Sequence, residues 1–308
     1  MKVILTGGAG FIGSWVADAL IADGHRVLIL DDLSSGKEEN IPKEAEFVKC
    51  DIRDRDALDG LFSDFKPDIV NHHAAQINVR KSVENPTLDA QVNILGSLNL
   101  LEISKRYDVK KFIFASTGGA IYGEPETIPV DERAIPLPIS PYGVSKLSVE
   151  RYLDYYNLVF GLEYVALRYS NVYGPRQNPH GEAGVIAIFC NRILEGQKCD
   201  IFGDGNQKRD YVFVGDLARA NVLSLRAPVG IYNLGTGIEI SVNDLINILV
   251  KATGIAANVH YLPYRAGEVQ RIALDISKAG KMIGWFPEVS FEDGITRTWN
   301  WYTKRKMV

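Results

Sequence analysis

The sequence is 308 residues long, carries a net charge of −4 and is 46% hydrophobic and 23% charged, as is usual for a globular protein with a sizeable core. The negative charge argues against a general nucleic-acid or anionic-membrane surface, so local arginines must hold any anionic ligand. The three cysteines are scattered, no stretch is long enough to span a membrane, and a first strand beginning at residue 2 leaves no room for a signal peptide, so we expect a cytoplasmic protein without a disulfide framework.

The first 22 residues predict a strand, a glycine turn and a helix. Lys2 to Leu5 is an apolar run suited to a buried strand, and apolar residues recur at helical spacing from Phe11 to Ala22. Three glycines suit a tight turn, a pyrophosphate against bare backbone and close packing of helix on strand: Gly7, Gly10 and Gly13. The free N–H groups of the first helical turn, which begins with Phe11 and Ile12, would then face the phosphates of a dinucleotide.

The second strand ends in two acidic residues that favour NAD. Arg26 to Leu30 is predicted as the strand, and Asp31 follows 18 residues after Gly13, where a carboxylate can accept hydrogen bonds from an adenosine ribose. Asp32 adds a negative charge and no Arg or Lys follows until Lys37, so an additional 2′-phosphate would find no partner.

The glycine spacing, G-x-x-G-x-x-G, resembles the extended form of the short-chain dehydrogenase superfamily. A third strand is predicted at Glu46 to Lys49, and the resemblance implies that Asp51 and Ile52, which follow it, contact the adenine. The alternative is that Asp51 caps a helix that begins at Arg53, and both roles can hold together.

A fourth strand, Asp68 to Asn71, ends in His72-His73-Ala74-Ala75. Adjacent histidines point to different sides of the chain, and no carboxylate or cysteine follows at ligand spacing, so we predict no metal site. The resemblance instead makes Ala74 and Ala75 small backbone beside the cofactor.

Ser82 to Arg106 predicts one long helix, because its apolar residues recur at helical spacing. Asn93 lies within that apolar stretch, and a buried amide must be hydrogen-bonded, so we expect it to hold a neighbouring strand or loop at the cofactor site. Lys111 to Ser116 predicts a fifth strand. Open parallel sheets bind ligands beyond the carboxyl ends of their strands, so the residues after Ser116 should face the nicotinamide.

The reacting pair is predicted in a Ser-Pro-Tyr-Gly-Val-Ser-Lys run, where Pro141 can open a helix that continues to about Phe160. Tyr142 and Lys146 are four residues apart and share a helix face. The ammonium of Lys146 and the charge of oxidised nicotinamide should lower the pKa of Tyr142, which makes the phenol the base.

Two further Y-x-x-x-K matches act as a control on this motif. Tyr107 and Lys111 straddle a loop and a strand start, and Tyr302 and Lys306 lie in the C-terminal tail. Tyr142 with Lys146 differs from both because it follows the fifth strand by a loop and opens a long helix, the placement that the superfamily uses.

The third member of the site departs from the family pattern. Nucleotide-sugar enzymes of this kind usually carry Ser or Thr five residues before the Gly of an I-Y-G element, to hydrogen-bond the reacting hydroxyl. With Gly123 closing that element here, Gly118 occupies the position. Either Thr117 or Ser116 supplies the hydroxyl, with Thr117 preferred, or Tyr142 works without one.

The second half of the chain matches the family's substrate-binding motifs in order. The resemblance implies that Asn171, in the run Arg168 to Arg176 after a sixth strand, holds the phosphates of a nucleotide sugar, and that Arg209 does the same. It further places Arg265 on the diphosphate and Glu268 on the uridine ribose. Two arginines that converge on one dianion suit a chain of negative net charge.

Residues 2 to about 290 therefore resemble the nucleotide-sugar epimerases and dehydratases, and most closely those that epimerise carbon 4 of a UDP-hexose. The implied activity interconverts UDP-galactose and UDP-glucose through a 4-keto sugar, with NAD retained between turnovers. The alternatives are an N-acetylated or uronic substrate, or a dinucleotide sensor without catalysis. Dehydration is disfavoured because Gly119 and Ala120 replace the acid and base that dehydratases carry there.

Alignment from Arg265 and Glu268 places Ile272 at the position that gates the sugar, where a small side chain would admit N-acetylated sugars; Ile272 could instead be a core residue. We expect a doubly wound, mostly parallel seven-stranded sheet in residues 1–172, with returning segments near 211–240, and a smaller mixed α/β substrate lobe in 173–308. Apolar residues on the two long helices favour a homodimer.

Overall fold

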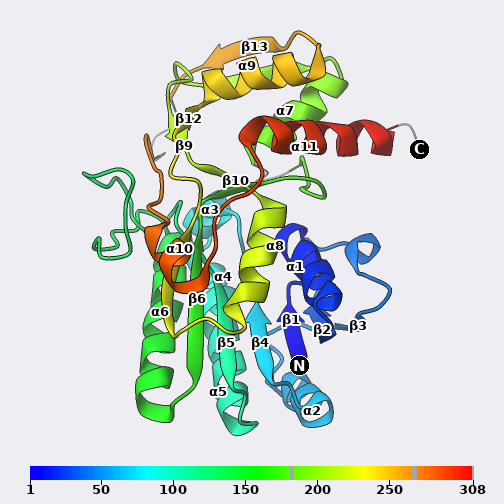
Figure 1. The fold of residues 1–308 in the computed structure, drawn as a ribbon, viewed down its shortest axis with the longest axis vertical. Coiled ribbons are helices and arrows are strands. Elements are labelled where there is room, and N and C mark those ends of the chain that lie inside the picture. The colour runs from blue at the N-terminus through cyan, green and yellow to red at the C-terminus, as the bar shows by residue number, and fades with distance from the viewer. Residues whose placement is uncertain (181–183, 265–268, 307–308) are drawn as a thin grey trace.

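The computed structural model of the protein describes residues 1–180, 184–264 and 269–306 (Figure 1). Its centre is a seven-stranded sheet, and every neighbouring pair of strands in it runs parallel. From one edge to the other the strands are β11 (Gly230–Leu234), β6 (Glu163–Tyr169), β5 (Lys111–Thr117), β4 (Ile69–His72), β1 (Lys2–Thr6), β2 (Arg26–Asp31) and β3 (Glu46–Lys49). The predicted doubly wound α/β fold is confirmed.

Helices cover both faces of this sheet because successive side chains of a strand point to opposite sides. Val3 and Leu5 of β1 face one apolar cluster, whereas Ile4 faces the other. The first cluster is closed by α1 (Phe11–Ala22), α8 (Val214–Ser224) and α10 (Ser277–Ile283), and the second by α2 (Arg55–Phe65), α5 (Gly96–Arg106) and α6 (Pro141–Phe160). Each fully buried aliphatic side chain in these layers contributes about 1.5 to 3 kcal/mol.

A smaller lobe lies at one end of the sheet, at the top of Figure 1. It begins directly after β6 with β7 (Asn171–Tyr173), which pairs in parallel with β10 (Tyr211–Phe213). A third apolar cluster fills it and includes the fully buried Leu245 and Leu249. Its other elements are α7 (Val185–Leu194), β8 (Lys198–Phe202) beside β13 (Asn258–Leu262), β9 (Lys208–Arg209) antiparallel to β12 (Ile240–Ser241), α9 (Val242–Thr253) and α11 (Phe291–Lys306).

The predicted single helix from Ser82 to Arg106 is wrong. The chain instead forms α3 (Val79–Glu84), α4 (Pro86–Ala90), a π-helical turn (Gln91–Leu95) and α5. Asn85 leaves the helical conformation, and its side chain accepts a hydrogen bond from the backbone N–H of Leu88. Pro86 opens the next helix, and the conformational restriction it imposes on the residue before it ends α3 at this point.

None of the helices in the described part of the chain combines the length and the apolar character needed to cross a bilayer.

Candidate active site

The turn between β1 and α1 is shaped by glycines that cannot be replaced without collision. Gly7 has φ of +70°, and a Cβ there would lie 2.6 Å from the backbone nitrogen of Ala74. A Cβ on Gly13 would lie 2.1 Å from the carbonyl oxygen of Gly7, so the helix packs directly on the turn. Gly10 precedes α1 without any side-chain cap, and no acidic residue stands in the first turn. The N–H groups of Phe11, Ile12 and Gly13 are therefore suited to an anion.

Asp31 and Asp32 lie at the end of β2. Asp31 is buried, and its carboxylate accepts hydrogen bonds from the backbone N–H groups of Ala9, at 3.0 Å, and Leu33, at 2.9 Å. Burial raises the pKa of Asp31, and these two hydrogen bonds act against that rise. Asp31 thus joins the glycine turn to the end of β2, while Asp32 accepts a hydrogen bond from the hydroxyl of Ser34.

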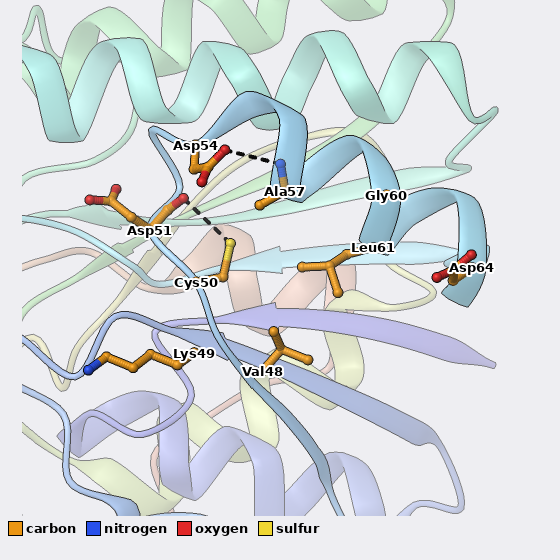
Figure 2. Close-up of a pocket in the computed structure, with 9 residues that line it drawn as sticks. All are labelled: Val48, Lys49, Cys50, Asp51, Asp54, Ala57, Gly60, Leu61 and Asp64. Atoms are coloured by element: carbon orange, nitrogen blue, oxygen red, sulfur yellow. Dashed lines mark hydrogen bonds between the residues drawn. The ribbon is translucent and has the colours of Figure 1, made fainter.

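A pocket of about 370 Å³ lies between β3 and α2, and Asp51 and Asp54 are among the residues that line it. Figure 2 shows these lining residues. Asp54, and not Asp51, caps α2, since its side chain accepts the N–H of Ala57. Asp51 instead forms a two-point ion pair with Arg53, which lowers the pKa of the Asp51 carboxyl. Ile52 is buried in the second apolar cluster.

The segment after β4 is fixed by Thr6. The hydroxyl oxygen of Thr6 accepts the N–H groups of His73 and Ala74, at 3.2 and 3.1 Å, and lies 2.7 Å from the Nδ1 atom of His72. The second ring nitrogen of His72 lies 2.9 Å from the hydroxyl of Ser97. These contacts hold Ala74, and with it the neighbouring Ala75, against the glycine turn. Within the ranges that the structure describes, no three His, Cys, Asp or Glu side chains gather as a metal site would need.

Tyr142 and Lys146 lie on the first turns of α6, which Ser140 caps by accepting the N–H of Gly143. The Lys146 Nζ atom donates to the carbonyl oxygen of Ala115 at 2.8 Å and lies 5.9 Å from the ring centre of Tyr142. Burial lowers the pKa of Lys146 to about 8. The structure thus brings the predicted pair together at the carboxyl end of β5.

Burial has the opposite effect on the phenol. It raises the pKa of Tyr142, and the negative charge of Asp89 adds to the rise. The chain by itself therefore does not produce the lowering predicted from Lys146, because removing the phenol from water outweighs the nearby ammonium. A lowered pKa of Tyr142 would need a positive charge beyond that of Lys146, which an oxidised nicotinamide would supply.

The three residues after Ala115 are not equivalent. Ser116 donates to the buried carboxylate of Glu150 at 2.6 Å, so its hydroxyl is committed to that partner. A side chain on Gly118 would collide with Leu274, whose Cδ1 atom would lie 2.4 Å from the new Cβ. Thr117 is buried, and its hydroxyl accepts the N–H of Ala120 at 3.2 Å. Of the hydroxyls considered from the sequence, that of Thr117 is thus the better placed.

Asn93 lies in the π-helical turn, which is a frequent feature of functional sites. Its side chain accepts the N–H of Gln76 at 2.8 Å and donates back to the carbonyl oxygen of the same residue. The prediction that Asn93 holds a neighbouring loop is confirmed, because Gln76 belongs to the loop after β4.

The predicted substrate residues lie on several elements. Asn171, in β7, has a buried side-chain oxygen with no hydrogen-bond partner among the described residues, and a Cβ on Gly119 would lie 3.5 Å from that oxygen. Arg209 lies in β9.

Ile272 is 2% exposed and packs in an apolar cluster with Leu274, which favours its core role over the gate. Arg265 and Glu268 lie outside the described residues.

A family model described as the NAD dependent epimerase/dehydratase family matches residues 3–235. The chain belongs to this family. NAD is its cofactor, and the uncapped N-terminus of α1 beside bare glycine backbone fits the pyrophosphate of such a dinucleotide.

The chain is also similar to solved structures and curated relatives that are named UDP-glucose 4-epimerase. A UDP-glucose 4-epimerase of Thermotoga maritima, crystallised with UDP-glucose, is 49% identical with a TM-score of 0.98, covering 99% of this chain and 100% of that one. The UDP-glucose 4-epimerase of Thermus thermophilus in complex with NAD is 47% identical with a TM-score of 0.95, over 98% and 99% of the two chains. The UDP-glucose 4-epimerase of Mycolicibacterium smegmatis is 44% identical over 97% of each.

Sequence reasoning missed several residues that build this epimerase site. Thr6 and Ser82 hold backbone groups of the loop after β4 and of Tyr142, and Asp89 is buried beside Asn93. Asp210 accepts from the N–H groups of Thr236, Gly237 and Leu274 and so joins three chain segments. Asp89 stands between Leu88 and Ala90, and Asp210 directly precedes Tyr211, Val212 and Phe213, so a charge beside apolar residues was the available signal.

Proposed function

We propose that this chain is an isomerase that interconverts UDP-galactose and UDP-glucose by inverting carbon 4 of the hexose. The observation that carries the proposal is the pair Tyr142 and Lys146, side by side at the carboxyl end of β5, in a chain 44–49% identical over almost its whole length to proteins named UDP-glucose 4-epimerase. The hydride chemistry is supplied by bound NAD.

The residues of the chain then have separate tasks. Tyr142 removes the proton from the 4-hydroxyl and returns it to the 4-keto sugar, and Lys146 holds a positive charge beside the phenol. Thr117 donates a hydrogen bond to the reacting oxygen. Because removal and return of the hydride balance, no free cofactor is consumed.

Binding roles complete the proposal. The turn of Gly7, Gly10 and Gly13 with the start of α1 holds the pyrophosphate, Asp31 and Asp32 the adenosine ribose, and Asp51 with Ile52 the adenine. Ala74, Ala75 and Asn93 line the cofactor site. On the substrate side we assign the diphosphate to Asn171, Arg209 and Arg265 and the uridine ribose to Glu268. The unsatisfied side-chain oxygen of Asn171 supports a polar partner there.

The test is to incubate the purified protein with UDP-galactose, without added NAD, and to follow the appearance of UDP-glucose. Tyr142→Phe should lower kcat by at least about 100-fold, since it removes the general base. The matched control is Tyr107→Phe, which removes the phenol from another Y-x-x-x-K match and should leave kcat unchanged. A Tyr142→Phe enzyme that turns over like the wild type would refute the proposal.

The choice of sugar is tested in the same assay with UDP-N-acetylglucosamine and UDP-glucuronate. The buried position of Ile272 supports its core role over that of a gate for N-acetylated sugars. A protein that binds NAD but turns over none of the three nucleotide sugars would instead support the dinucleotide-sensing alternative.

We also propose a cytoplasmic homodimer, each protomer of which divides into its two domains near residue 172. The C-terminal part of α6 exposes a row of apolar side chains, and among them Leu158 is 88% exposed. Pairing such faces across a two-fold axis removes them from water. Sedimentation should show a dimer for the wild type and a monomer for Leu158→Asp; a monomeric wild type would end this part of the proposal.

A further inference from the structure

A buried carboxylate that no part of the proposed mechanism uses lies under the catalytic helix. Asp89, in α4, is 1% exposed. Its Oδ1 atom accepts hydrogen bonds from the side-chain amides of Gln76, at 2.9 Å, and Asn93, at 3.0 Å. Moving a carboxylate out of water costs free energy that side-chain amide donors offset only in part, so the buried position of Asp89 calls for a reason.

The hydrogen bonds of Asp89 lead to the turn that carries the catalytic pair. The amide nitrogen of Asn93 that donates to Asp89 and to the carbonyl oxygen of Gln76 also lies 3.3 Å from the hydroxyl oxygen of Ser145, its third acceptor. Ser145 directly precedes Lys146, and its own hydroxyl donates to the carbonyl oxygen of Tyr142 at 2.9 Å. One amide thus connects the carboxylate to the backbone between the two reacting residues.

Asp89 differs from Glu150, the other buried carboxylate nearby, in having no cation paired with it among the described residues. Glu150, one helical turn after Lys146, forms a two-point ion pair with Arg168 and also accepts from Ser116. Among the described residues Asp89 has no cation within ion-pair distance. Its field is therefore not cancelled locally, and it acts on the groups around it.

We propose that Asp89 is a positioning residue for the catalytic pair, which holds Asn93 and Gln76 against α6 and supplies a buried negative charge that keeps the Lys146 ammonium in place. This inference rests on the proposed function for its kinetic consequences, but its electrostatic part concerns the protein alone.

The charges that face the pair come from three elements. Asp89 lies in α4, Glu150 lies in α6, and His72 and His73 lie at and after the end of β4; burial lowers the pKa of both histidines, so they are neutral near pH 7. Asp89 raises the pKa of Lys146 and that of Tyr142. A variant without this charge should therefore have a lower pKa at both Lys146 and Tyr142. A variant that only disturbs the local structure would not shift the two pKa values in the same direction.

The experiment compares the wild-type holoenzyme with Asp89→Asn, which keeps the shape and removes the charge. Both limbs of the pH profile of kcat should move to lower pH by about one unit, since they belong to the coupled pair. The titration of Lys146, followed by NMR of protein labelled in its lysine side chains and assigned with Lys146→Met, should move the same way. Asp89→Glu, which restores the charge, should titrate near the wild type.

The matched control is Glu84→Gln, which removes an exposed carboxylate five residues away and should change neither profile. Asp89→Ser supplies a second neutral variant should Asp89→Asn fail to fold. An unchanged Lys146 titration in a folded neutral variant would overturn the inference. Because that titration needs no turnover, a wild type unable to epimerise UDP-galactose would refute the proposed function and leave the result on Asp89 standing.

Discussion

Two adjacent histidines show how burial decides what a residue can do. His72 is fully enclosed, with Thr6 and Ser97 at its two ring nitrogens. His73 stacks on Tyr169, whose hydroxyl lies 3.1 Å from its Nε2 atom, while its buried Nδ1 atom finds no partner in the part of the chain that the structure describes. Burial, with the charge of Lys146, lowers the pKa of His73 to about 3 and that of His72 well below its usual value. Both rings are therefore neutral structural groups at neutral pH.

The histidines predict a loss of stability in acid. A histidine has a pKa of about 6.5 in the unfolded chain, so below that pH the unfolded state binds protons that the folded state refuses. The stability that the protein gains from keeping these histidines neutral is complete above pH 6.5 and is lost as the pH falls towards 3. The free energy of unfolding can be measured in urea between pH 7.5 and 4.5. In His73→Phe the slope of this free energy against pH should be smaller than in the wild type by up to about 1.4 kcal/mol per pH unit. The exposed His180→Gln is the control, and an unchanged slope in His73→Phe would contradict the argument.

Among the elements, the sequence predicted best those whose ends carry local signals. The bounds of α1 and α6 are as predicted, because Gly10 and Pro141 mark the starts and a glycine C-cap, Gly161, follows α6. The prediction for the stretch after β4 was wrong because the helical spacing of the sequence continues through Asn85, where a helix cap and Pro86 interrupt the helix. The π-helical turn around Asn93 has no local signature at all, since it depends on packing against α6 and on the loop after β4.

The glycine turn yields a prediction about the cofactor. A Cβ on Gly13 would press on the carbonyl oxygen of Gly7, so Gly13→Ala must displace the turn from the start of α1. We expect the variant to lose its bound NAD, measured by absorbance of cofactor released from the purified protein. In the control Gly60→Ala the new Cβ meets no atom within 4 Å, and its helical position in α2 should gain up to about 1 kcal/mol of stability without loss of NAD. Full NAD occupancy in Gly13→Ala would show that the turn tolerates the shift.

At the scale of the whole molecule, the site depends on contacts that join distant parts of the chain. Asp210 links the end of β9 to the residues after β11 and to Leu274. The ion pair of Arg168 with Glu150 extends through the hydroxyl of Tyr122 to Asn233, and so ties β6, α6 and β11 to the catalytic loop, the segment between β5 and α6 that contains Tyr122. No sequence spacing indicates which of these polar residues meet. Family motifs therefore gave roles to Asn171 and Arg209, but gave none to Asp210, although it directly follows Arg209.

The buried ion pair itself predicts a strong asymmetry between single and double substitutions. Arg168 is 1% exposed and Glu150 fully buried, with 2.6 Å between the charged atoms. Arg168→Met leaves an uncompensated carboxylate in the core and should cost about 3 to 5 kcal/mol in urea unfolding, whereas Arg168→Met combined with Glu150→Met removes both charges and should recover most of that loss. The difference between the two variants measures the cost of burying one charge alone. If the double variant instead loses at least as much stability as Arg168→Met alone, then water reaches Glu150 once Arg168 is gone. The interior beside the catalytic loop would then open when this ion pair is broken.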